Sequence, residues 1–104
     1  MIDEKGLEFV AMTIIANAGD ARSYAFQALQ KARAKDFDKA DELIKKSDES
    51  AKLAHQAQTD VMVREANGEK LDLNVLFVHS QDHLMTSMSA VELIKELIMI
   101  YRDK

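Results

Sequence analysis

The chain has 104 residues, a formal net charge of −4 and a pI near 5.3. A chain of this length is expected to form one domain, here residues 1–104. The acidic balance argues against a nucleic-acid partner. Cysteine is absent, which excludes disulfides, thiolate metal sites and a cysteine nucleophile. Neither a secretory signal nor a run of eighteen apolar residues occurs, so the sequence predicts a cytoplasmic protein that does not insert into membranes.

The first predicted helix covers residues 4–34. Its small and apolar residues recur at intervals of three and four: Leu7, Val10, Ile14, Ala18, Ala21, Ala25, Ala28 and Ala32. Gly19 interrupts this pattern, and glycine costs about 1 kcal/mol relative to alanine inside a helix, so we expect a kink or a close backbone contact there. Asp20 and Arg22, two positions apart, cannot face each other on a helix, and we leave both outside the candidate site.

Two further helices complete the predicted fold. One covers residues 36–66, from a cap at Asp36 to the Asn67-Gly68 stop signal. The other covers residues 74–101, with Asp72 or Asn74 as its cap. No alternating strand pattern appears, so the sequence predicts an all-α, antiparallel three-helix bundle.

The third predicted helix is apolar around most of its circumference in its C-terminal half. The apolar residues there are Leu84, Met85, Met88, Val91, Leu93, Ile94, Leu97, Ile98, Met99 and Ile100. Two helices of the same small chain cannot cover all of this surface. We therefore expect the chain to self-associate through this helix.

Two histidines and an aspartate share one turn of that helix. His79 and His83 are four positions apart and lie on one face, with Asp82 alongside. Imidazole near neutral pH can ligate a metal or accept a transferable group. The His-x-x-Asp-His spacing also approaches the His-x-x-Glu-His pattern of some zinc peptidases. Spacing alone leaves open a group acceptor, a zinc site and two ordinary polar residues.

The amino-acid sequence around these histidines is more specific than their spacing. Val78-His79-Ser80-Gln81-Asp82-His83-Leu84-Met85-Thr86 closely resembles the active-site segment of the lactose/cellobiose-specific IIA components of the bacterial phosphoenolpyruvate-dependent sugar phosphotransferase system. Three further segments agree with that family: residues 18–23, 36–40 and 54–59. Residues 76–79 and 85–88 favour a cellobiose- or chitobiose-like member.

The resemblance implies a phosphotransferase component that carries a phosphoryl group. His79 matches the histidine that such proteins phosphorylate. They accept phosphate from the phosphohistidine of the phosphocarrier protein HPr and pass it to a cysteine of the cognate IIB component, during uptake of a β-linked disaccharide such as cellobiose, chitobiose or lactose. His83 and Gln81 are candidate contacts to the phosphoryl oxygens. Gln81 points about 200° away from His79 on a helix, so its contact would cross a subunit boundary.

The resemblance also implies a homotrimer with Asp82 on its threefold axis, where three copies surround one structural metal ion. An oxygen-only site favours Mg²⁺. Val75, Val78, Met85 and Ser89 share that side of the helix, where a lone carboxylate is costly unless it is coordinated or paired. The alternative is a zinc-binding helical-bundle protein that uses His79 and His83.

Overall fold

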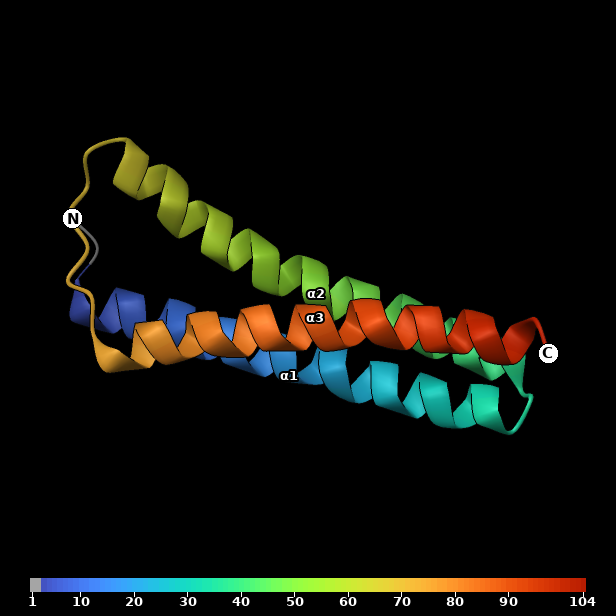
Figure 1. The fold of residues 1–104 in the computed structure, drawn as a ribbon. Coiled ribbons are helices and arrows are strands. Elements are labelled where there is room, and N and C mark those ends of the chain that lie inside the picture. The colour runs from blue at the N-terminus through green and yellow to red at the C-terminus, as the bar shows by residue number, and fades with distance from the viewer. Residues whose placement is uncertain (1–2) are drawn as a thin grey trace.

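Three helices form an elongated antiparallel bundle in the computed structural model, which describes residues 3–104 (Figure 1). They are α1 (Glu4–Arg33), α2 (Phe37–Ala66) and α3 (Val75–Arg102). The prediction of an all-helical, three-helix chain is confirmed. Within residues 3–104, no helix has the length and apolar character needed to cross a membrane.

Polar side chains cap the start of each helix. Asp3, Asp36 and Asn74 each accept a hydrogen bond from the backbone N–H three residues further on, at 2.7, 3.4 and 2.8 Å. Each bond satisfies a donor that the first helical turn leaves free. Because Asp36 and Asn74 are caps, α2 and α3 begin one residue later than the predicted 36–66 and 74–101. Of the two candidate caps for α3, Asn74 is the one used.

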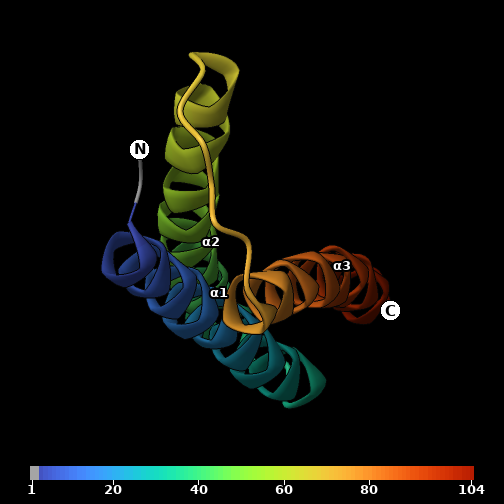
Figure 2. The same cartoon turned by 90° about the vertical axis from the view of Figure 1, so that its left-hand side faces the viewer.

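The first helix packs along both of the others, whereas α2 and α3 meet each other only sparsely. The C-terminal half of α2 diverges from α3, which both views show (Figures 1 and 2). Charged side chains link α2 to α3 at the other end: Lys95 lies 2.7 Å from Asp48, and Arg102 lies 2.5 Å from Asp41.

Alanines on α1 allow this close packing. The alanines of α1 that are fully buried are Ala11, Ala18, Ala21, Ala25, Ala28 and Ala32. Larger buried side chains of α3 pack against that stripe, among them Leu84, Val91 and Ile94. The buried hydroxyl of Ser47 on α2 donates to the carbonyl oxygen of Ala21 at 2.7 Å, so this polar group enters the core with a partner.

Of the kink or close backbone contact predicted at Gly19, the close contact is wrong. A Cβ added to Gly19 would meet nothing within 4 Å, and α1 continues through this residue without a break in helical structure. Gly19 is exposed, on the side of α1 that lines a groove with α3. The sequence reveals a glycine in a helix but not which neighbour, if any, approaches it.

Gly19→Ala is therefore expected to stabilise the protein. Alanine should raise the free energy of unfolding by about 0.5–1 kcal/mol, because it lowers the entropy of the unfolded chain and meets no clash. Denaturant unfolding measures this change. Gly68→Ala is the contrasting variant: Gly68 has φ +93° at the end of α2, so alanine there should destabilise by about 1–2 kcal/mol. A loss of stability in Gly19→Ala would contradict the open surroundings of this residue.

One side of α3 is left uncovered by the other helices. We call it the outer face of α3; its residues are Val75, Val78, Asp82, Met85, Ser89, Leu93, Leu97 and Ile100, all exposed. Val75 and Leu93 have exposed fractions of 85% and 66%. The prediction that one chain cannot cover this helix is thus confirmed.

Candidate functional site

The two histidines of α3 contact each other directly. Their Nε2 atoms are 3.1 Å apart, and the rings meet edge to face with centroids 4.5 Å apart. This follows from the four-residue spacing, which places side chains one above the other on a helix. A hydrogen bond between two imidazole nitrogens requires a proton on one of them and a lone pair on the other. In such a hydrogen bond one ring donates and the other accepts, and the tautomers of His79 and His83 set which ring does which.

One member of the histidine pair lines a groove between α1 and α3. His79 is exposed, while His83 is half-buried and lines the groove together with Ser87. The groove has a volume of about 470 Å³. Its α1 wall is formed by Gly19, Arg22, Ser23, Phe26, Gln27 and Gln30. One imidazole of the pair, that of His83, thus opens onto a hollow with room for a small anionic group.

Arg22 is the groove residue that sequence reasoning left out. Its guanidinium lies over the ring of Phe26, 5.7 Å from the ring centroid, and both side chains border the same groove as His83. The α1 wall follows a three- and four-residue spacing, a second stripe beside the buried alanines. That periodicity is visible in the sequence, but the sequence does not show that this stripe faces the histidine turn.

Within a single subunit, the side chain of Gln81 is directed away from the two histidines. Its side-chain oxygen accepts a hydrogen bond from Gln58 of α2, and its nitrogen lies 3.3 Å from the hydroxyl of Ser80. The predicted opposite orientation of Gln81 and His79 on the helix is borne out. A contact between Gln81 and a group on His79 would therefore have to come from another subunit.

Asp82 lies on the outer face of α3 and is exposed. Within residues 3–104, no group of three or more histidine, aspartate or glutamate side chains is placed to hold a metal ion. The zinc interpretation of His79 and His83 consequently gains no third ligand, although a zinc site needs at least three protein ligands. Asp82 supplies only carboxylate oxygens, which suit Mg²⁺, and one carboxylate per chain completes a site only where several chains meet.

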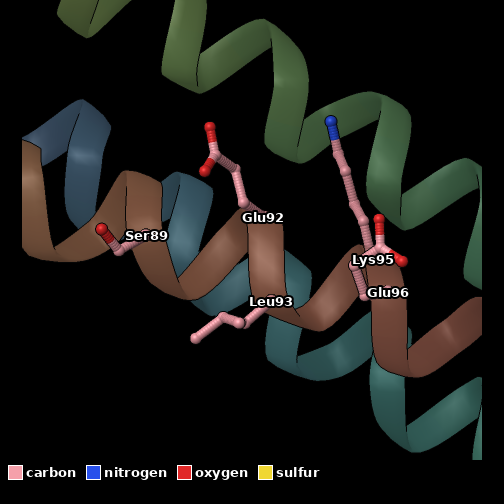
Figure 3. Close-up of a pocket in the computed structure, with 5 residues that line it drawn as sticks. All are labelled: Ser89, Glu92, Leu93, Lys95 and Glu96. Carbon is pink, nitrogen blue, oxygen red and sulfur yellow. The ribbon is translucent and has the colours of Figure 1, made fainter.

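A second hollow, of about 590 Å³, is bordered by α3 residues alone (Figure 3). Glu92 and Lys95 extend toward α2, whereas Leu93 projects away from it. No imidazole lines this hollow. It is open surface that includes Ser89 and Leu93 of the outer face of α3, and we place the chemistry at the histidine groove.

Known proteins resemble this chain over nearly its full length. The family model described as "PTS system, Lactose/Cellobiose specific IIA subunit" matches residues 9–102. The PTS system lactose-specific EIIA component of Staphylococcus epidermidis is 40% identical over 96 residues, which cover 92% of each chain. The cellobiose-specific enzyme IIA from Bacillus anthracis superposes with a TM-score of 0.89 at 38% identity, covering 99% of this chain and 93% of that one.

A chain from the solution structure of the IIA(Chitobiose)–HPr complex of Escherichia coli superposes with a TM-score of 0.77 at 40% identity, covering 93% of this chain and 94% of that one. The histidine pair, the groove and the outer face residues all lie inside the region that the family model matches. This chain belongs to the lactose/cellobiose-specific IIA subunits of the sugar phosphotransferase system.

Proposed function

We propose that this IIA component accepts a phosphoryl group from HPr onto His79 and passes it to a cysteine of its cognate IIB component. The observation that carries the proposal is the exposed His79 imidazole with a second imidazole against its Nε2 atom. In the first transfer a nitrogen lone pair of His79 forms the new N–P bond, while the N–P bond of the donor breaks and its electron pair returns to the donor imidazole. In the second, the cysteine thiolate forms an S–P bond as the His79 N–P bond breaks.

We place the reaction at Nε2 of His79, because this atom faces His83. Once Nε2 of His79 bonds to phosphorus, it can neither donate a hydrogen bond to Nε2 of His83 nor accept one from it. The His83 tautomer with a proton on Nε2 then places an N–H beside the new phosphoryl group, where it can donate to one of the phosphoryl oxygens. Positioning and charge stabilisation of this kind supply most of the catalysis in phosphoryl transfer.

A homotrimer through the outer face of α3 is the second part of the proposal. Exposed apolar side chains on this face, including Val75, Met85 and Leu93, favour burial against other copies. In such a trimer the three Asp82 carboxylates would come together, and we propose that they hold one structural Mg²⁺. The ion would neutralise carboxylates that otherwise repel one another, and it takes no part in the transfer steps.

The class of sugar that we propose is taken from the names of the similar proteins. Relatives named for lactose match at 40% and 44% identity, and structures named for cellobiose and chitobiose match at 38% and 40%. These similar values do not separate one sugar from another. We propose that the chain serves the uptake of a β-linked disaccharide of this class.

Mass spectrometry tests the carrier function. The protein is incubated with phosphoenolpyruvate, the general phosphotransferase enzyme and HPr, and its intact mass is measured. A gain of one phosphate that acid removes is expected, because phosphohistidine is acid-labile and phosphoserine is not. A stable phosphate, or no gain beside a competent control IIA, would contradict the proposal.

Metal removal tests Asp82 separately. A chelator should lower the melting temperature of the wild-type trimer, because it removes the ion that screens the three carboxylates. Asp82→Leu should remain trimeric and be insensitive to chelator, since it has no such charges to screen. Thermal unfolding with and without chelator gives the comparison. An unchanged wild-type melting temperature would count against the Asp82 site and would leave the role of His79 intact.

A further inference from the structure

Arg22 presents a positive charge to the histidine groove without a paired carboxylate. Among the described residues, 3–104, the structure records no ion pair for Arg22. Its contact is with Phe26, which holds the guanidinium 5.7 Å from the ring centroid. A cation–π contact at an exposed site is weak, so it orients the guanidinium without fixing it. Arg22 thus keeps its hydrogen-bond donors for another partner.

The rest of the groove also suits an anion. No aspartate or glutamate lines the groove. Apart from Arg22 and His83, its polar lining consists of the hydroxyl and amide side chains of Ser23, Gln27, Gln30 and Ser87. This is a local departure from a chain whose net charge is −4. Every charged or ionisable side chain that lines the groove can therefore donate to an oxyanion.

His83 connects this groove to the reacting histidine. Its Nε2 atom is 3.1 Å from Nε2 of His79, and its side chain lines the groove with Arg22. A phosphoryl group on Nε2 of His79 would therefore lie next to His83, which lines the same groove as Arg22. The planar guanidinium forms paired hydrogen bonds with phosphate oxygens, which a single ammonium group cannot reproduce.

We infer that Arg22 is a catalytic residue that binds the phosphoryl oxygens during transfer to His79. The inference rests on the proposed function. Arg22 forms no covalent bond: the N–P bond to His79 forms, the N–P bond of the donor breaks, and the electron pair returns to the donor imidazole. Arg22 neutralises negative charge on the transferring group throughout and keeps its own protons.

Single-turnover phosphorylation by phospho-HPr tests this role. Arg22→Gln removes the charge and keeps a polar side chain, Arg22→Lys keeps the charge and loses the paired donors, and Arg33→Gln is the matched control. Arg33 is an exposed arginine in the last turn of α1, outside the groove. Circular dichroism and melting temperature establish that all three variants fold.

The expected result separates chemistry from docking. Arg22→Gln should lower the maximal transfer rate about ten- to hundredfold, the range for loss of one hydrogen bond to a charged group. The HPr concentration at half-maximal rate should change little. Arg22→Lys should recover part of the rate, and Arg33→Gln should match wild type.

Three outcomes would overturn the inference. Arg22→Gln that transfers at the wild-type maximal rate would show no contact with the phosphoryl group. A rise only in the half-saturating HPr concentration would make Arg22 a docking residue. An equal loss in Arg33→Gln would indicate a general charge effect. If wild type accepts no phosphate, the proposed function itself fails, and that result is distinct from a fault confined to Arg22.

Discussion

His79→Ala is expected to accept no phosphoryl group from phospho-HPr while keeping its fold. The variant lacks the only nucleophile proposed for the step, so the loss should be complete within detection. The imidazole of His79 is exposed, and surface substitutions of this kind usually change stability by no more than about 0.5 kcal/mol. Intact-mass measurement after incubation with the phosphoryl donors gives the first readout, and denaturant unfolding gives the second.

His83→Ala is the matched control on the same helical turn. It removes the neighbour of Nε2 but leaves the nucleophile, so phosphorylation should continue about 10²–10³-fold more slowly, the usual cost of losing one hydrogen-bond donor to the transferring group. Phosphorylation of the His79→Ala variant would show that another residue is the nucleophile. Complete loss in His83→Ala, with full uptake by His79→Ala, would reverse the assignment within the pair.

Local sequence patterns were enough to predict the three helices and the buried side of α1. The three- and four-residue spacing on α1 identifies the buried side of that helix, because core packing needs a continuous stripe. The cap at Asn74 is equally local, since its oxygen bonds a backbone group only three residues away. The sequence left Asp72 and Asn74 as alternative caps, and the structure shows that α3 begins at Val75 with Asn74 as its cap.

Contacts between helices were not predictable in the same way. Gly19 looked like a place of close approach, but helix packing left it open at the groove. The link from Gln58 to Gln81 joins two helices whose relative rotation no single helix encodes. Arg22 shows the same limit. Its place on α1 was clear, whereas its place beside His83 depends on how α1 and α3 are rotated against each other.

The histidine pair was predictable because both members belong to one helix. The four-residue spacing places His79 and His83 together whatever the tertiary fold. The spacing alone could not separate metal binding from group transfer, since both uses need neighbouring imidazoles. The groove favours group transfer over metal binding, because it surrounds His83 with hydrogen-bond donors for an anion. Among residues 3–104, no third side chain is placed to complete a metal site with the two histidines.

Leu93→Lys is expected to dissociate the proposed trimer into folded monomers. Leu93 lies on the outer face of α3 and is 66% exposed in the single chain, so lysine there costs the monomer little. In a trimer built through this face, the ammonium would be buried without a partner, at a cost of about 3–5 kcal/mol per uncompensated charge. Each 1.4 kcal/mol is about a tenfold change in an association constant, so one such charge weakens assembly more than about a hundredfold.

Light scattering at micromolar concentration measures the outcome. Wild type should have about three times the 11.7 kDa mass of the chain, and Leu93→Lys should have the mass of one chain with its helical circular dichroism intact. Leu53→Lys is the matched control, because Leu53 is a comparably exposed leucine, at 52%, on α2. It should leave the trimer unchanged, since the proposed interface is confined to α3. A monomeric wild type, or equal dissociation by Leu53→Lys, would mean that the apolar side chains of the outer face of α3 do not hold the assembly together.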